Sequence, residues 1–264
     1  MPNLAPRVPL TVVTLLLAGC VGTSGPNDDI LNFDAAVIAA DGALEDLEMM
    51  HGPGLGLRGG VFPGLIGNRP DCPMTQDVFM CDPIEREGIE YTRTISYMDA
   101  AGDPQGAYDE GTTASIHYEI SVVGGRARER WSADIDRQRS LTVTGLLDGV
   151  DAVTWNGTGT GTILRSRHMD GGDVRTYNVV SSDRITDVVV PYPRADESWP
   201  LSGTITKSMT ITRTSDGGDE TKERTASIEF NGTQIVEVTV GDETFTMDLT
   251  ERRFGPGKMG RGKH

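Results

Sequence analysis

Apolar and polar residues alternate along most of the chain between about residue 90 and residue 250. Thr, Val, Ile and Tyr alternate there with polar residues, and short turn sequences rich in Gly, Asn and Asp interrupt the alternation. Because successive side chains of a strand point to opposite faces of a sheet, the pattern predicts antiparallel strands with one apolar face. We expect a mainly β fold, a large curved antiparallel meander of about 9–11 strands that forms a half-barrel or a sandwich.

Two glycine-containing turns set the expected pairing in this region. Gly124-Gly125 predicts a two-residue hairpin that places Tyr118 opposite Trp131. Gly241-Asp242 predicts another, with Val238 opposite Phe245. At Asn231-Gly232 a bulged loop is preferred to a two-residue turn, because only the bulge leaves the flanking strands with one common apolar face.

These registers divide the side chains into a buried group and an exposed group. The positions expected in the core are Ile116, Tyr118, Trp131, Val236, Val238, Phe245 and Met247. The positions expected to point away from it are His117, Glu119, Arg128 and Arg130. The polar face carries many Thr and Ser residues and is expected to contact water or to line a polar surface.

One segment ahead of the strands has a helical period. Apolar residues recur at steps of three and four from Ile30 to Leu47, whereas Asp34, Asp41 and Glu45 lie largely off this stripe. The pattern predicts an amphipathic helix over residues 29–50 that packs on the β-domain, and Gly42 allows it to be split in two.

Residues 51–88 are expected to form a Gly- and Pro-rich loop that contains Cys72 and Cys81. In an exported protein an even pair of cysteines indicates a disulfide, because that compartment is oxidising. A redox or metal pair is the alternative, but it requires closer spacing and histidine partners. We therefore expect Cys72 and Cys81 to be bonded and to hold this loop at the entry to the β-domain.

The first residues have the features of an export signal. Arg7 precedes an apolar run from Val8 to Ala18, which is too short to span a bilayer and ends in Leu17-Ala18-Gly19-Cys20. This ending resembles the lipobox of bacterial lipoproteins. The resemblance implies removal of residues 1–19, attachment of a diacylglyceryl group to the thiol of Cys20, and acylation of the new N-terminus. A plain secretory signal with an incidental cysteine is the alternative.

The implied anchor leads to an expected location. Two or three acyl chains hold a protein firmly on a membrane, and residues 20–28 would be the lipidated tether. Val21 stands where many inner-membrane lipoproteins of enterobacteria have Asp. The resemblance therefore favours the outer membrane where two membranes are present, with the protein facing the periplasm or the cell surface.

The net charge of the chain and its distribution limit the classes of partner that we expect. The net charge of -15 argues against nucleic acid, whose phosphates would be repelled. Residues 251–264 differ from the rest, because they contain five basic residues and only Glu251 as an acid. They are expected to form a flexible basic tail, with contact to anionic lipid or to acidic cell-wall polymer as the alternative.

The chain lacks the sequence motifs of common catalytic sites. There is no Gly-x-Ser-x-Gly, P-loop or His-Glu-x-x-His motif, and the four histidines have no metal-ligand spacing. We expect no enzyme activity, no cofactor and no metal site in the antiparallel domain of residues 89–250. The expected role is a lipid-anchored binding or scaffold protein of the cell envelope. The alternative is a carrier of a hydrophobic ligand, by fold-level analogy with half-barrel lipoprotein-sorting proteins.

Overall fold

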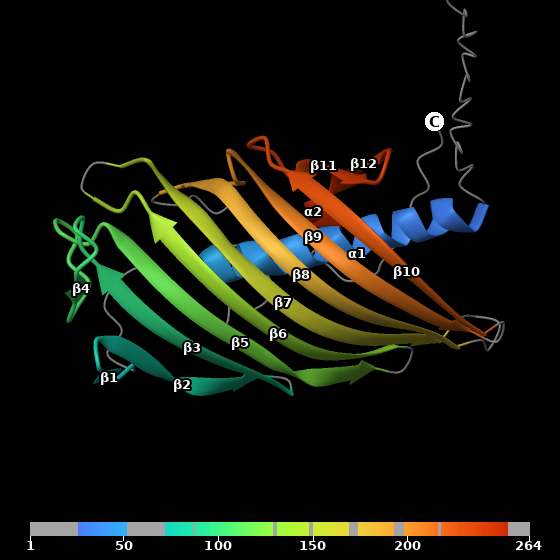
Figure 1. The fold of residues 1–264 in the computed structure, drawn as a ribbon, viewed down its shortest axis with the longest axis horizontal. Coiled ribbons are helices and arrows are strands. Elements are labelled where there is room, and N and C mark those ends of the chain that lie inside the picture. Colours follow the sequence, from blue (N-terminus) through green and yellow to red (C-terminus); the bar gives the residue numbers. More distant parts are fainter. Residues whose placement is uncertain are drawn as a thin grey trace, which may run out of the picture.

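One antiparallel sheet of twelve strands forms the body of the protein (Figure 1). This computed structural model describes residues 26–51, 72–86, 88–128, 131–147, 150–168, 174–192, 198–215 and 218–252. The strands are β1 (Met74–Thr75), β2 (Val78–Arg86), β3 (Ile89–Met98), β4 (Pro104–Gln105), β5 (Ser115–Arg128), β6 (Trp131–Thr144), β7 (Ala152–His168), β8 (Val174–Pro191), β9 (Ser202–Ser215), β10 (Gly218–Glu229), β11 (Ile235–Val240) and β12 (Glu243–Asp248).

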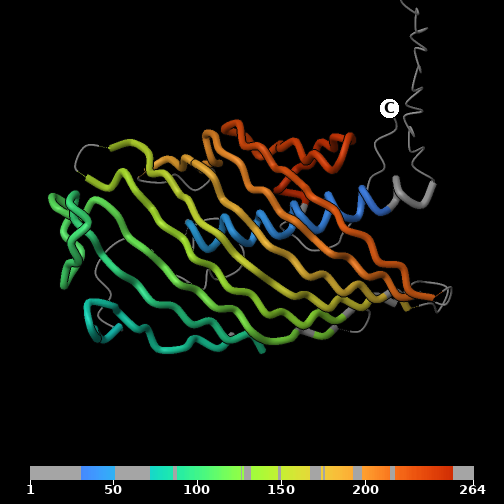
Figure 2. The backbone as a smooth tube through the Cα atoms, viewed as in Figure 1, coloured from blue at the N-terminus to red at the C-terminus, as the bar shows by residue number. Residues whose placement is uncertain are grey.

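The strands follow each other across the sheet almost in chain order. The hydrogen-bonded order is β1-β2-β3-β5-β6-β7-β8-β9-β10-β11-β12, and β4 pairs with β3. The central strands are long and bend along their length, which gives the sheet its curvature (Figure 2). The predicted curved meander is therefore confirmed, and its strands form a single open sheet, which excludes the sandwich.

Helix α1 (Pro26–His51) packs on the inner, concave face of the sheet (Figure 1). It begins three residues before the predicted helix, ends one residue after it, and continues through Gly42 without a break. Its closest backbone neighbours are β9 to β12 and the short helix α2 (Leu249–Arg252). No helix in the described ranges is long and apolar enough to span a bilayer.

The core lies between α1 and the inner face of the sheet. Aliphatic and aromatic side chains from almost every strand are buried there, including Ile95, Ile116, Tyr118, Leu141 and Trp155. Tyr118 and Trp155 stack with ring centroids 5.7 Å apart. Because inward residues alternate with outward ones, each long strand contributes to both faces of the sheet.

The predicted turn at Gly124-Gly125 is wrong. Strand β5 continues through both glycines to Arg128, and Tyr118 pairs with Leu141 instead of Trp131. The glycines allow a close approach to the start of β3, because a Cβ at Gly124 would lie 2.2 Å from the carbonyl oxygen of Gly88. The pairing is displaced by an even number of residues, so the predicted faces of β5 are nevertheless correct.

The predicted C-terminal meander is confirmed. Val238 pairs with Phe245 and Val236 with Met247 around the turn at Gly241-Asp242. Ile228 pairs with Val238 and lies on the same buried face, as the bulged loop required.

The other predicted core positions have different outcomes. Ile116, Tyr118, Val236, Val238 and Met247 are buried, and Phe245 is only partly buried. His117 and Glu119 lie on the outer face. The side chains of Arg128, Arg130 and Trp131 lie outside the described residues.

Part of the predicted loop 51–88 forms strands. Residues 52–71 lie outside the described residues, but Val78–Arg86 forms strand β2, which pairs with β3. Pro83 lies within β2, where a proline cannot donate a ladder hydrogen bond. It lies at a register shift between Cys81 and Ile84, where the ladder is already interrupted, so its missing N–H is tolerated.

Candidate functional site

The inner face carries a cluster of buried charges, which we call the inner charge cluster: Asp46, Arg137, Arg139, Asp183 and Lys207. These side chains come from α1, β6, β8 and β9, and all are at most 4% exposed. Arg139 contacts two carboxylates, with 2.6 Å from Nε to Asp46 Oδ1 and 2.6 Å from Nη2 to Asp183 Oδ2. Lys207 Nζ donates a hydrogen bond of 2.5 Å to Asp183 Oδ1. Asp183 is thus shared by two cations.

Glycines make the space that these long side chains need. In β7, Gly159 pairs with Arg139 and Gly161 with Arg137. A Cβ at Gly159 would lie 2.4 Å from Arg139 Nη1, and one at Gly161 would lie 3.0 Å from Arg137 Cγ. On the helix, a Cβ at Gly42 would lie 2.8 Å from Lys207 Cε. Gly42 is therefore a packing residue that admits Lys207.

Burial and the neighbouring carboxylates shift the pKa values of the cations in different directions. Burial lowers the pKa of Lys207, and the charges of Asp46 and Asp183 offset only part of this effect. Burial also acts to lower the pKa of Arg139, but the same two carboxylates outweigh it and the pKa is raised. Burial lowers the pKa of Arg137 to about 9, with a further contribution from the charge of Arg139.

Further polar contacts hold α1 along its length. Asp41 is 3.3 Å from Arg165, Glu45 is paired with Arg137, and Tyr177 donates a hydrogen bond of 3.2 Å to Asp34. The acidic stripe of α1 therefore contacts the sheet, although the helical pattern had placed it away from the packed face. Conversely, Phe33, which was expected on the packed stripe, is 38% exposed.

The inner charge cluster joins helix α1 to the sheet. Each cation has a carboxylate partner, so the charges largely neutralise one another. In the described part of the chain, no group of three or more His, Cys, Asp or Glu side chains is placed to hold a metal ion.

The outer face of the same strands has a different chemistry. Its centre is a line of uncharged hydroxyl and amide side chains, one from each of seven adjacent strands, which we call the outer hydroxyl row. In register order from β3 to β10 it consists of Thr92, Ser121, Gln138, Thr160, Ser182, Ser208 and Thr225. Hydrogen bonds join some neighbours, such as Gln138 Nε2 to Ser121 Oγ at 2.9 Å.

Two adjoining hollows lie over this row. Their volumes are about 840 and 520 Å³, and both are lined by Gln138, Thr160, Ser182 and Ser208. Charged side chains flank the row. Glu119 and Arg184 line the smaller hollow together with the buried Arg139 and Asp183, and Asp136, Glu223 and Arg224 line the larger one. The outer face thus has an open, polar depression in which exposed neutral side chains lie between charged ones.

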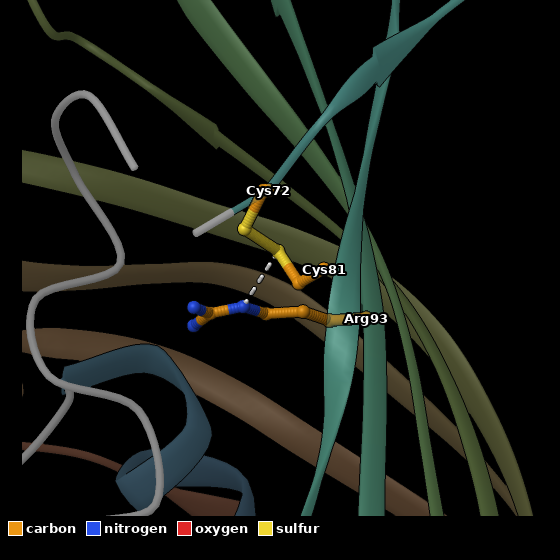
Figure 3. The surroundings of a disulfide bond; sticks show 3 residues. All are labelled: Cys72, Cys81 and Arg93. Carbon is orange, nitrogen blue, oxygen red and sulfur yellow. Dashed lines mark hydrogen bonds between the residues drawn. A yellow bond between two sulfur atoms is a disulfide. The ribbon is translucent and has the colours of Figure 1, made fainter. Parts of the chain in front are cut away.

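The predicted disulfide is present at the edge of the sheet. Cys72 and Cys81 are bonded, and Arg93 Nε donates a hydrogen bond of 3.2 Å to the Sγ of Cys81 (Figure 3). The bridge ties the start of the described β region to β2, next to a buried arginine of β3. Cys20, the predicted lipidation site, and nearly all of the basic tail lie outside the described residues.

Sequence reasoning found neither the inner charge cluster nor the outer hydroxyl row as a site. The sequence did contain a sign of the inner charge cluster. Arg137 and Arg139 lie four and two positions before Leu141, so the alternation of the strand places them on the same face as the buried Leu141 and Val143. For the row the sequence showed only that the polar face is rich in Thr and Ser, because the alignment of these residues depends on the registers of seven strands. Comparison with known proteins shows no matching family model, no matching curated protein and no matching solved structure.

Proposed function

We propose that this protein is a lipid-anchored, non-enzymatic binding or scaffold protein of the bacterial cell envelope. In this proposal the acyl chains on Cys20 hold it in the membrane, and the outer face of the sheet binds the partner. The anchor is supported by Leu17-Ala18-Gly19-Cys20 at the end of a short apolar run. Where two membranes are present, we propose the outer membrane, with the basic tail available for contact with anionic groups.

The main support for a binding role is the contrast between the two faces of the sheet. The inner face is occupied by α1 and its ion pairs, whereas the outer face presents an open polar depression across several strands. Binding sites in proteins are usually hollows in which a few polar groups converge.

The anchor is tested by replacing Cys20 with alanine. The variant should remain unprocessed or become soluble, because it has no thiol for lipid attachment. The measurement is the share of the protein in the membrane fraction after cell lysis, together with the mass of the N-terminal peptide. Membrane partition of the Cys20→Ala variant that equals that of the wild-type protein would contradict the anchor. An unlipidated N-terminal peptide in the wild-type protein would also contradict it.

The binding surface is tested by cross-linking in living cells. A photoreactive residue at Ser208, in the outer hydroxyl row, should give an adduct with an envelope component. The same residue at Asp103, in an exposed loop between β3 and β4, is the control and should give little adduct. Equal labelling from both positions would count against the outer face as the binding surface.

A carrier of a hydrophobic ligand is the second candidate. It is favoured by the half-barrel shape and by the large apolar side chains on the inner face of β3 to β7, such as Tyr97, Tyr118 and Trp155. Native mass spectrometry of the protein without its lipid anchor distinguishes the two. A retained lipid mass would favour the carrier, and a mass equal to that of the chain would favour the binding protein.

A further inference from the structure

The disulfide at the edge of the sheet lies beside a buried cation. Cys81 and Arg93 are register partners in β2 and β3, and Arg93 is only 4% exposed. Its Nε donates a hydrogen bond of 3.2 Å to Cys81 Sγ, so the guanidinium group contacts one of the two bridge sulfurs directly (Figure 3). This contact joins a permanent positive charge to a sulfur atom that becomes negatively charged when the bridge is reduced to a thiolate.

The contact is stronger with the reduced bridge than with the oxidised one. A disulfide sulfur is neutral and accepts a hydrogen bond only weakly, whereas a thiolate carries a full negative charge. Hydrogen bonds between charged groups are roughly twice as strong as those between neutral groups, and burial of Arg93 limits the screening of the attraction by water. Arg93 therefore stabilises the reduced state, and a disulfide whose reduced state is stabilised is reduced more easily.

The two cysteines differ in exposure. Cys72 is 4% exposed, whereas Cys81 is only partly buried. A thiol reagent therefore reaches Cys81 more readily than Cys72. Asp82, the next residue, is exposed, so water screens its negative charge more than it screens the charge of the buried Arg93. Of these two charges, Arg93 acts more strongly on Cys81.

We propose that the Cys72–Cys81 bridge is a redox-active site that a dithiol protein reduces reversibly, with Cys81 as the thiolate that Arg93 stabilises. The proposal goes beyond the binding role and does not depend on the outer face of the sheet. A dithiol is the class of reductant that opens a disulfide completely, because its second thiol resolves the mixed disulfide that its first thiol forms.

Reduction takes two exchange steps. A thiolate of the dithiol attacks Cys81 Sγ, the bond between Cys81 and Cys72 breaks, and Cys72 leaves as a thiolate that takes up a proton. The second thiol of the dithiol then loses its proton and attacks the dithiol sulfur that is bonded to Cys81, so that Cys81 leaves as a thiolate beside Arg93. The bridge gains two electrons, and the dithiol is oxidised to its own disulfide. One of its two protons is then on Cys72 and the other is in water.

Reduction removes the covalent link between the start of the described β region and β2. The remaining links there include the pairing of Met74 and Thr75 with β2 and a hydrogen bond from Met80 N to Pro73 O. The edge of the sheet at β1 is therefore held less firmly in the reduced protein than in the oxidised protein.

The first test measures how readily the bridge is reduced. The full chain with Cys20→Ser retains Cys72 and Cys81 as its cysteines and is equilibrated near pH 8 with mixtures of reduced and oxidised dithiothreitol. Alkylation stops the exchange, and mass spectrometry gives the reduced fraction. Arg93→Met removes the charge and should raise the ratio of reduced to oxidised dithiothreitol needed for half reduction at least about fivefold. Arg165→Met removes another inner-face cation and should stay within about twofold.

The second test separates the charge of Arg93 from its packing. Adding Cys72→Ser to Cys20→Ser leaves Cys81 as the single thiol, and the rate of its alkylation by iodoacetamide is measured against pH. The midpoint of this profile should lie at lower pH in the folded protein than in the same protein unfolded in urea. Arg93→Met should raise the midpoint by about one pH unit, and Arg93→Lys, which keeps a positive charge, should lie between the two.

Three results would overturn the proposal. The first is a bridge that stays oxidised in the folded protein under excess reduced dithiothreitol. The second is the same reduction equilibrium in the parent protein and in Arg93→Met. The third is an alkylation midpoint that Arg93→Met leaves unchanged, because a packing role alone would change the rate of alkylation at every pH without moving the midpoint.

Discussion

On the inner face of β6, β8 and β9 several polar side chains are charged and buried, whereas on the outer face of the same strands many are neutral and exposed. Lys207 and Ser208 are neighbours in β9, yet Lys207 is 3% exposed and ion-paired, while Ser208 lines an open hollow. A buried charge requires its partner, because an uncompensated charge in the interior is costly. Exposed hydroxyl groups can be exchanged one at a time at little cost, and this leaves the outer face available for binding.

The largest effect is expected from removing the carboxylate that two buried cations share. Asp183→Ala leaves Lys207 and one side of Arg139 without a counter-charge and should lower the free energy of unfolding by about 3–5 kcal/mol. Ser182→Ala, one residue away on the outer face, should cost less than about 0.5 kcal/mol. Urea unfolding of both variants measures the two losses of unfolding free energy. Similar losses would show that the inner face does not depend more strongly on its polar side chains than the outer face does.

The disulfide should have the next largest effect. Cys72 and Cys81 are nine positions apart, and a loop of this length contributes about 2–3 kcal/mol on the chain-entropy account. The variant Cys72→Ser with Cys81→Ser should lose this amount in urea unfolding. If thiol alkylation of unreduced, unfolded protein labels both cysteines, the bridge is absent and this prediction fails.

Filling the space beside the inner charge cluster should cost about 1–3 kcal/mol. Gly159→Ala forces Arg139 to move, because the new Cβ would lie 2.4 Å from its Nη1. Gly161→Ala should cost less, because its nearest contact is 3.0 Å. Gly106→Ala is the control, since the nearest atom there is 3.9 Å away. Thermal unfolding should rank the three in this order, and a reversed order would contradict the packing role of Gly159.

The smallest effect concerns the alkaline stability of the protein. The pKa of Lys207 is lowered in the folded protein, so between this lowered pKa and the ordinary value of about 10.5 the unfolded chain binds more protons at this position. Stability from this group therefore rises with pH over that interval. The wild-type protein should gain stability relative to Lys207→Met as the pH increases from about 8 to about 10. A difference that shrinks with rising pH would contradict the assigned direction.

The alternating pattern was sufficient to predict the fold class, because it depends only on which face each residue occupies. The C-terminal meander was also predictable, since the turn at Gly241-Asp242 is flanked by short strands whose apolar residues match. Gly124-Gly125 misled the prediction of the hairpin, because a glycine pair serves a close approach between strands as well as a turn. The faces of β5 and β6 were nevertheless assigned correctly, because the pairing was wrong by an even number of residues.

The acidic stripe of α1 was misplaced for a different reason. Asp41 and Glu45 look like solvent-facing residues in a helical pattern, and only the sheet supplies Arg165 and Arg137 as their partners. Pairings between residues so far apart in the sequence cannot be read from a single chain. The outer hydroxyl row is similar, because its members are scattered from β3 to β10 and become neighbours only through the registers of the sheet.

The most direct test of this account compares two neighbours that point to opposite faces of β9. Lys207→Met and Ser208→Glu are made in the full chain with Cys20→Ser, and each protein is sedimented with insoluble cell-envelope material. We predict that Lys207→Met sediments like the parent protein, because Asp183 keeps Arg139 as its partner and the outer face is unchanged. Ser208→Glu should remain in the supernatant. Loss of binding in Lys207→Met with retention in Ser208→Glu would contradict the account and would place the binding site on the inner face.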